Sequence, residues 1–202
     1  MTDIAMSAGA RPPAPETRRE RYARGKALRK AGPRERHGDF AGAHARDPVA
    51  LLARSDASRI ARLLPLRYQR MTASPFAFLR GAAAVMAADL AGEPRTGVAV
   101  QGCGDCHLMN FGAFASPEDN ILFDINDFDE TLAGVDFTLD LKRLAASVAV
   151  AAQAGGVSDK KARAFAEGAA QAYRTQIQQM ALLSPLEIWR SRIDLPAQIA
   201  SF

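Results

Sequence analysis

The sequence changes from helix-type to strand-type patterning once, between Arg95 and Asp136, and then changes back. Two runs there, TGVAVQG and NILFDIND, have the short alternating pattern of strands, and residues 103–119 lie between them. This intervening stretch is rich in glycine and polar residues, which indicates a loop. We therefore predict a strand, a functional loop and a second strand, forming a small β-hairpin that holds the active loop.

Helix-type periodicity dominates the rest of the chain. The expected helices are two short ones between 47 and 65 that end near Pro65, one continuous run at 74–90 capped by Ser74, one from 136 to 154, one from 158 onward and a short one in the tail. The predicted class is α+β, mostly α.

The first 45 residues are expected to form a basic, flexible N-terminal arm, followed by one domain at 46–202. Residues 1–40 hold ten Lys or Arg against five Asp or Glu, whereas the other 162 residues hold sixteen against seventeen. The basic charge therefore belongs to the arm alone. Its scattered Gly, Pro and Arg are typical of a solvated segment, so we expect no nucleic-acid partner.

The composition is that of a folded domain, with 48% hydrophobic and 24% charged residues. No apolar run reaches the roughly 18–20 residues that a membrane-spanning helix needs. The first residues also lack the apolar core of a secretory signal. We therefore expect a cytoplasmic protein without a membrane partner.

The stretch between Arg95 and Lys142 is strongly acidic. It contains no Lys or Arg and nine carboxylates: Asp105, Glu118, Asp119, Asp124, Asp127, Asp129, Glu130, Asp136 and Asp140. Neighbouring carboxylates repel one another unless a divalent ion or a cation from elsewhere neutralises them. Because Mg²⁺ prefers carboxylate and amide oxygens, the first hypothesis is a magnesium or manganese site. The alternative is a solvated acidic loop of turn and cap residues.

Spacing within and after the loop favours phosphoryl transfer. GDCHLMN contains Asp105, His107 and Asn110, and Asp127 ends the next strand-type run. Kinase-type chemistry needs a base for the hydroxyl proton, and an amide and a carboxylate for a metal. We predict that Asp105 is the catalytic base and that Asn110 and Asp127 are metal ligands at the same site. Asp124, on the opposite face of the run, is the alternative to Asp127.

The GDxHxxN loop and the following I-D-F segment resemble those of aminoglycoside phosphotransferases and related small-molecule kinases. Asp136 and Asp140, in DFTLDLKRLA, are similar to the D-x-x-x-D-L tail of those enzymes. The resemblance implies the catalytic-loop half of a kinase-like fold, in which Asp140 and His107 support the loop structurally. The alternative role for His107 is that of a general base.

A longer resemblance is to the uncharacterised bacterial family called domain of unknown function 2252. It is carried by LRYQRMTASPFAFLRGAAAVMAADLA, VQGCGDCHLMNFGAFASPE, FDINDFDETLAG and DLKRLAASVAVAA, and extends from near Gly25 to near Asp194. It implies a remote kinase-like protein whose Gly-rich strand turn and ATP-binding lysine lie beyond the matched region.

From this resemblance we expect the chain to correspond to the N-terminal half of such a protein. It would then bind ATP only together with the missing half, and would be inactive alone. The expected partners are a small-molecule or protein phosphoacceptor and a second copy of the chain, the latter through an exposed apolar cleft. The alternative function is a non-catalytic remnant or regulatory binding domain that retains the fold.

Cys103, Cys106 and His107 also form a C-x-x-C-H sequence, which is the signature of c-type haem attachment and contains that of a redox pair. Haem attachment needs export, for which no signal is visible. LMNFGAF cannot form the helix that a redox pair uses, and there are no further cysteines for zinc. We expect incidental thiols and no haem.

Overall fold

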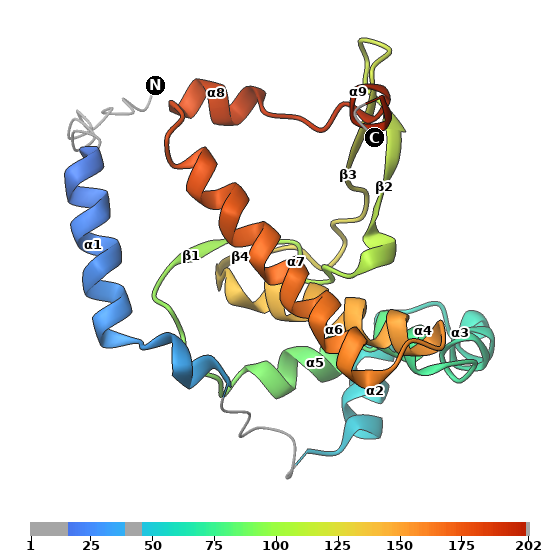
Figure 1. Cartoon of the computed structure of the whole chain (residues 1–202). Helices are drawn as coiled ribbons and strands as arrows, with labels where there is room; N and C mark the ends of the chain where they lie inside the picture. Colours follow the sequence, from blue (N-terminus) through green and yellow to red (C-terminus); the bar gives the residue numbers. More distant parts are fainter. Residues whose placement is uncertain (1–15, 39–45, 201–202) are drawn as a thin grey trace, which may run out of the picture.

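The computed structural model describes residues 16–38 and 46–200 (Figure 1). Its helices are α1 (Arg18–Ala31), α2 (Pro48–Asp56), α3 (Leu64–Met71), α4 (Pro75–Gly81), α5 (Ala83–Leu90), α6 (Thr138–Ala154), α7 (Asp159–Met180), α8 (Pro185–Arg190) and α9 (Leu195–Ile199), with short 3₁₀ turns η1 (Arg34–Gly38), η2 (Ala61–Leu63) and η3 (Leu108–Asn110). Its strands are β1 (Ala99–Gly102), β2 (Phe111–Ala115), β3 (Ile121–Ile125) and β4 (Leu132–Asp136). The predicted α+β, mostly α class is confirmed.

The strand pairing differs from the single predicted hairpin. β1 pairs antiparallel with β4, and β2 pairs antiparallel with β3, giving two separate two-stranded sheets. β2 lies in the stretch that was expected to be a loop, where Gly112 masks the alternating pattern. A Cβ at Gly112 would lie 2.2 Å from Nδ2 of Asn126, so a larger residue there would displace the Asn126 side chain. The loop at 103–110 therefore connects two sheets instead of lying inside one hairpin.

The continuous helix expected at 74–90 is two helices. Ser74 caps α4 as predicted, with its hydroxyl accepting a backbone hydrogen bond of 3.0 Å. At Ala82 the backbone leaves the helical conformation (φ −115°, ψ 36°), and α5 begins at the next residue. A Cβ at Gly81 would lie only 2.5 Å from Cγ of Met71. The glycine thus lets α4 pack closely on the end of α3.

Pro65 begins a helix where the sequence predicts an end. It occupies the first turn of α3, where its missing N–H has no intrahelical partner to lose.

A small core forms beside this helix. Its buried members are Leu52, Met71, Ala82 and Val85, and Leu51 and Tyr68 pack against them. α2, α3 and α5 are held together by this core.

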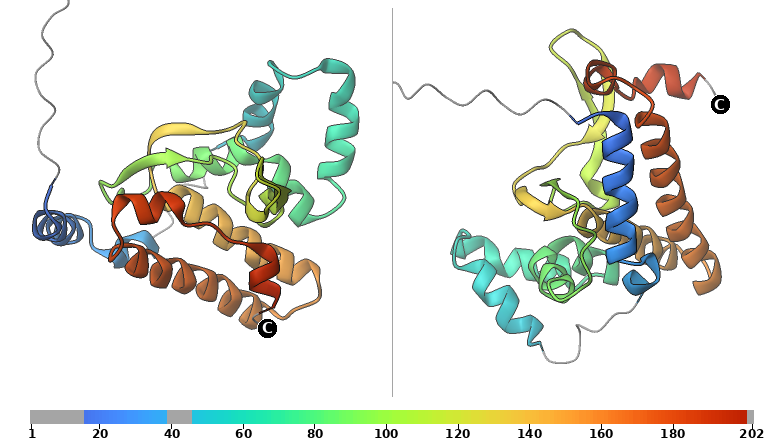
Figure 2. Two further views of the ribbon diagram at one scale, coloured as in Figure 1. Left: turned by 90° about the horizontal axis from the view of Figure 1, so that it is seen from above. Right: turned by 90° about the vertical axis from the view of Figure 1, so that its left-hand side faces the viewer.

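α6 and α7 form a helical hairpin that lies across the centre of the molecule (Figures 1 and 2). Ala162 of α7 is 1% exposed, and Ser147 of α6 is completely buried. The turn between the two helices contains Gly156 at φ 80°, a conformation that favours glycine. α6 also contacts α4, α5 and η3, so it connects the helical part of the fold to the 103–110 loop.

Asp136 joins β4 to α6 and to the segment before β1. Its carboxylate accepts hydrogen bonds from the backbone and hydroxyl of Thr96 (2.6 and 2.7 Å) and from those of Thr138 (3.1 and 2.8 Å). Burial raises the pKa of Asp136, but these hydrogen bonds outweigh it, so the pKa lies below its usual value. The residue is a structural anchor away from the loop.

The N-terminal arm contains α1, which the sequence interpretation did not assign. Thr17 and Glu20 form a capping box: the Thr17 hydroxyl accepts from the Glu20 N–H at 3.3 Å, and the Glu20 carboxylate accepts from the Thr17 N–H at 2.7 Å. No residue of α1 is buried, and the helix lies along one side of the molecule (Figure 2). The T-x-x-E spacing was the sequence signal for it.

Across 16–38 and 46–200, none of the helices combines the length and the apolar character that crossing a membrane requires.

Candidate functional site

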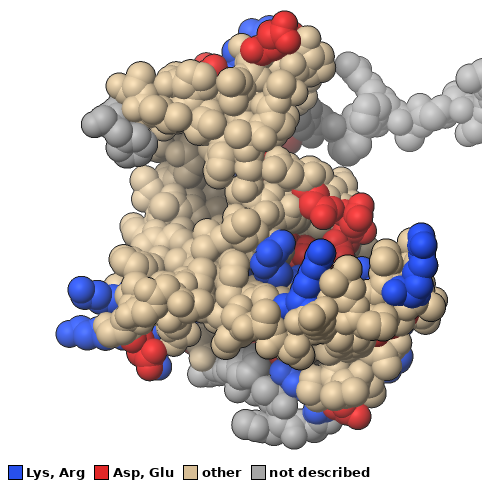
Figure 3. All heavy atoms as spheres, turned by 90° about the vertical axis from the view of Figure 1, so that its right-hand side faces the viewer, with Lys and Arg blue, Asp and Glu red and all other residues tan. Residues whose placement is uncertain are grey.

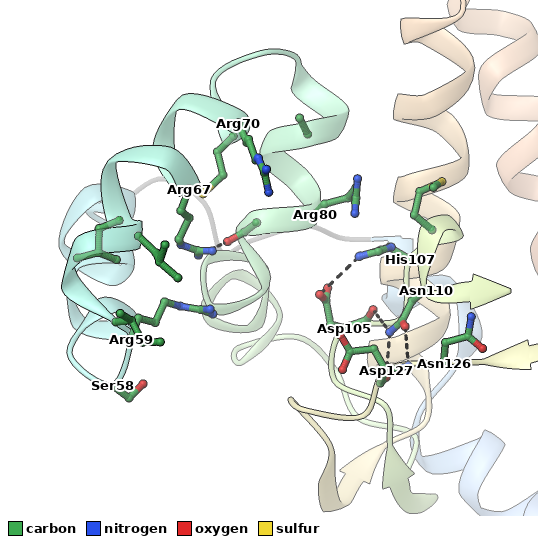
Figure 4. A pocket seen from close by; sticks show the side chains of 17 residues that line it. Ser58, Arg59, Arg67, Arg70, Arg80, Asp105, His107, Asn110, Asn126 and Asp127 are labelled. Carbon is green, nitrogen blue, oxygen red and sulfur yellow. Dashed lines mark hydrogen bonds and ion pairs between the residues drawn. The ribbon is translucent and has the colours of Figure 1, made fainter. Parts of the chain in front are cut away.

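A pocket of about 740 Å³ lies between α3 and α4 on one side and the 103–110 loop on the other (Figure 4). Its loop wall consists of Asp105, His107, Met109, Asn110, Asn126 and Asp127. The structure thus brings Asp105, Asn110 and Asp127, the three residues with predicted chemical roles, to the wall of one pocket.

Asn110 connects the loop to the segment that follows β3. Its side-chain nitrogen donates to the backbone carbonyls of Asp105 and Asp127, both at 3.1 Å. Its side-chain oxygen accepts from the backbone N–H of Asp127 at 3.0 Å. The residue is 5% exposed, so these bonds fix Asp105 and Asp127 relative to each other. One lone pair of the Asn110 oxygen remains available.

Asp105 is paired with a cation from just beyond the acidic stretch. Arg143 of α6 donates from Nε to Oδ1 of Asp105 at 2.6 Å, and its Nη2 contacts the same oxygen. Nη2 also donates to the carbonyl of Leu79 at 2.8 Å. Only 4% of the Arg143 side chain is exposed. The ion pair is therefore part of what relieves the repulsion that the sequence predicts.

His107 lies beside this ion pair. Its Nε2 is 3.5 Å from Oδ2 of Asp105, while its Nδ1 is buried and has no hydrogen-bond partner among the described residues. Burial lowers the pKa of His107; Asp105 opposes this effect, and Arg143 and Arg80 reinforce it. The imidazole is thus neutral at neutral pH.

α6 holds the loop at two points. The carboxylate of Asp140 accepts hydrogen bonds from the backbone N–H of Cys103 (2.7 Å) and of Gly104 (3.0 Å). Further along the helix, the Ser147 hydroxyl accepts from the N–H of Leu108 at 3.0 Å. These contacts satisfy loop donors that would otherwise be unpaired, which fixes the loop conformation.

Gly104 allows the loop to pass close to the start of β4. Its φ is 84°, and an added Cβ would lie 2.0 Å from the carbonyl oxygen of Glu130. Burial raises the pKa of Glu130, and the nearby charges of Asp105 and Asp127 raise it further. The loop wall is therefore an acidic environment in which a cation would be favourable.

Asp127 and Asp124 differ in their access to the pocket. Asp127 lines the pocket, and its Oδ1 accepts from the N–H of Asp129 at 3.1 Å. Asp124 lies in β3, outside the lining, and its Oδ1 bonds the N–H of Ile125 at 2.8 Å. Only Asp127 is placed to act together with Asp105 and Asn110.

In the described ranges, no group of three or more His, Cys, Asp or Glu side chains is placed to hold a metal ion. Asp105 is engaged by Arg143, which leaves one carboxylate oxygen of Asp127 and one lone pair of Asn110. Mg²⁺ accepts such sparse protein ligation when waters and substrate phosphates complete its shell. The residues therefore fit a metal that arrives with a phosphate ligand.

The opposite wall is basic, which the sequence interpretation missed. Arg59, Arg67, Arg70 and Arg80 line it (Figure 4). Figure 3 shows basic side chains directly beside acidic ones on one face of the molecule. Arg67 and Arg70 are three residues apart, a spacing that places them on the same side of a helix and that was visible in the sequence.

Both cysteines are free and buried, each 6% exposed. Burial raises the pKa of Cys103, and it raises that of Cys106 to about 12. Nearby carboxylates add to both shifts. Thiols that stay protonated at neutral pH are poor nucleophiles and poor metal ligands, so the two residues contribute packing to the loop.

A family model described as an uncharacterised protein conserved in bacteria (DUF2252) matches residues 59–202. The chain belongs to this family. The DUF2252 match begins at Arg59, later than the resemblance near Gly25 suggested, and it covers both walls of the pocket. No match was found among curated proteins or among solved structures.

Proposed function

We propose that this DUF2252 protein carries a metal-dependent phosphotransfer site in the pocket between α3, α4 and the 103–110 loop. The observation that carries the proposal is the Asn110 connection. It holds Asp105 and Asp127 at one pocket, through hydrogen bonds to the backbone of both. A base and a metal-binding carboxylate held next to each other are the protein parts that phosphoryl transfer needs.

Asp105 is the proposed general base. A carboxylate can accept the proton of an acceptor hydroxyl, and Arg143 bonds only one of the two Asp105 oxygens. Arg143 also fixes the orientation of the carboxylate, since the guanidinium is buried and bonded to Leu79 as well. His107 flanks Asp105 in the neutral state and is assigned a structural role, as is Asp140, which binds the loop backbone.

Asp127 and Asn110 would hold a Mg²⁺ or Mn²⁺ ion, which supplies charge neutralisation for transferring phosphates. This assignment follows from the access of Asp127 to the pocket and the free lone pair on Asn110. The kinase-like relationship and ATP as the phosphoryl donor remain part of the proposal. The sequence has no G-x-G-x-x-G or Walker-type pattern, so we expect the chain alone to turn over far more slowly than the 1–100 s⁻¹ typical of kinases.

A second candidate function is that of a non-catalytic binding domain. It is favoured by one observation: Arg143 occupies one oxygen of Asp105, and His107 lies 3.5 Å from the other. A carboxylate so engaged binds and orients well, but it has less freedom to accept a proton.

Single-turnover measurements separate the two functions. The purified chain, in excess over γ-labelled ATP with Mg²⁺, is followed for release or transfer of labelled phosphate to sugar, aminoglycoside and protein acceptors. The phosphotransfer proposal predicts a slow reaction that Asp105→Ala lowers by about 10²–10⁴-fold. A matched Asp129→Ala variant, at an exposed carboxylate outside the pocket lining, should leave it unchanged. If the chain binds ATP but shows no reaction that depends on Asp105, the result would favour the non-catalytic binding domain.

A further inference from the structure

The arginines of the helical wall differ in how they are paired. Arg67 is fixed, since its Nη2 donates to the carbonyl of Gly81 at 2.6 Å and its Nε lies 3.6 Å from Asp56. Arg59 has a loose contact of 3.9 Å with Glu130. The guanidinium groups of Arg70 and Arg80 have no hydrogen bond and no ion pair with any residue in the described ranges. Two free guanidinium groups and two partly engaged ones thus face one pocket.

The two walls carry opposite charge, but among the described residues an arginine of the helical wall contacts a carboxylate of the opposite side only in the loose 3.9 Å pair of Arg59 with Glu130. Asp105 uses Arg143 from α6, and Asp127 bonds a backbone N–H. Figure 4 shows the helical arginines extending toward the loop wall, with Arg80 on the side nearest His107. A complementary ligand therefore carries negative charge toward the helices and can carry a cation toward the loop. A metal-bound phosphate chain has this distribution of charge.

The lining also indicates which part of such a ligand is recognised. Apart from its charged and amide residues, it consists mainly of aliphatic side chains, Ile60, Leu63, Leu64, Met71, Ala77 and Met109. Among the described residues, no Phe, Tyr or Trp lines it. Stacking on aromatic rings is a common way to bind a nucleobase, and this pocket offers none. Its polar contacts are suited to phosphate oxygens, which arginine binds through its fork of N–H donors.

We propose that the arginine wall, formed by Arg59, Arg67, Arg70 and Arg80, binds the polyphosphate chain of the phosphoryl donor. The site would then recognise this chain with little contribution from the nucleobase of a nucleotide. The inference rests on the proposed function for its placement of the metal. It also assigns to these arginines the phosphate-binding role that a Gly-rich loop and lysine have in kinases, so the chain alone would bind ATP, in contrast to the expectation from the resemblance that ATP binds only together with a missing half. A cation wall of this kind attracts the ligand electrostatically, so binding weakens with salt.

Calorimetric titration of the full chain with inorganic tripolyphosphate, ATP and AMP, each in Mg²⁺ and in EDTA, tests the inference. We expect tripolyphosphate and ATP to bind with Kd values within a few-fold of each other, and AMP to bind at least about tenfold more weakly. Arg70→Gln and Arg80→Gln should each weaken tripolyphosphate binding by about tenfold or more, since a hydrogen bond to a charged group is lost. Both side chains are exposed and have no bond to another described residue, so the variants should keep the wild-type Tm.

Arg62→Gln is the matched control, because Arg62 is exposed, lies in η2 beside the wall and is absent from the lining. It should change the Kd by less than about twofold. Arg80→Lys, which keeps the charge but loses the fork, should fall between Arg80→Gln and the wild type.

Three results would overturn the inference. The first is unchanged tripolyphosphate affinity in both Arg70→Gln and Arg80→Gln, and the second is an equal loss of that affinity in Arg62→Gln. The third is ATP binding far stronger than tripolyphosphate binding, which would show that the nucleobase is recognised. Failure of the proposed phosphotransfer function can be distinguished from failure of this inference. In that case the arginine variants weaken tripolyphosphate binding, but no turnover depends on Asp105.

Discussion

Arg143 of α6 and Asp105 of the loop form a largely buried ion pair, with Nε 2.6 Å from Oδ1, 4% of the Arg143 side chain exposed and 15% of the Asp105 side chain exposed. The pair joins the α6–α7 hairpin to the candidate site. It also gives Asp105 a fixed orientation before any ligand binds, because Arg143 is itself held by the carbonyl of Leu79.

Breaking this pair should be strongly destabilising. Arg143→Gln removes the cation and leaves the Asp105 carboxylate poorly compensated, which should lower the free energy of unfolding by about 3–5 kcal/mol. Chemical denaturation measures the change. In a double-mutant cycle with Asp105→Asn, the two losses should be clearly less than additive. Arg163→Gln, at an exposed position of α7, should stay within about 0.5 kcal/mol of the wild type. Additive losses would show that the two side chains are not coupled.

Gly104→Ala and Gly134→Ala form a matched pair that separates steric conflict from backbone strain. Both glycines have positive φ, 84° and 76°. A Cβ at Gly104 would lie 2.0 Å from the Glu130 carbonyl oxygen, whereas at Gly134 nothing lies within 4 Å. We expect a loss of about 1 kcal/mol for Gly134→Ala, from strain alone, and a distinctly larger loss for Gly104→Ala. Thermal melts of the two variants measure this, and equal losses would contradict the close approach of the loop to β4.

Asp136 should make the folded state sensitive to acid. Its folded-state pKa lies below the unperturbed value of 3.8, so the unfolded state binds more protons. The stabilisation is therefore complete above the unfolded-state pKa and is lost as the pH falls from there through the lower folded-state pKa. Asp136→Asn should reduce the free energy of unfolding at pH 7 by about 2–4 kcal/mol and flatten its decline below about pH 4.

Denaturation at several pH values tests this expectation. Glu167→Gln, at an exposed site of α7, provides the control and should keep the slope of the wild type. An unchanged slope in Asp136→Asn would mean that its bonds to Thr96 and Thr138 do not favour the ionised carboxylate.

Neither cysteine should react in the folded protein. Both are buried, and the pKa of the Cys106 thiol is raised to about 12, so almost none of it is thiolate at pH 8. Titration with a thiol-specific chromogenic reagent should detect no fast-reacting group in the native protein and two in denaturant. Rapid reaction of one thiol in the native state would reopen the redox interpretation of the C-x-x-C sequence.

The sequence predicts the helices well where periodicity and caps agree. α6 and α7 lie where Asp136, Gly155 and Ser158 place them, because long amphipathic runs leave little ambiguity. It fails at Ala82 and Pro65, where packing and not propensity decides: Gly81 must sit against Met71, and Pro65 is tolerated in a first turn. Strand pairing is also missed, since β1 joins β4 across a long stretch of chain and no local pattern specifies that partner.

The candidate site is partly visible in the sequence. The spacing of Asp105, Asn110 and Asp127 anticipates that they meet, because a loop and a neighbouring strand end carry them. The sequence gives no sign that Arg143 engages Asp105, since that contact depends on how α6 crosses the loop. The arginine wall is also a tertiary feature: it requires α3 and α4 to face the loop across the pocket.

The most direct test of the account is the effect of Mg²⁺ on ATP affinity, measured calorimetrically for the wild type, Asp127→Asn and Asp124→Asn. The two substitutions remove the same charge within three residues, but only Asp127 lines the pocket. We expect Mg²⁺ to strengthen ATP binding by about tenfold or more in the wild type and in Asp124→Asn, and we expect this gain to disappear in Asp127→Asn. A gain that survives in Asp127→Asn, or that is lost in Asp124→Asn, would contradict the proposal that this pocket is a metal-dependent phosphotransfer site.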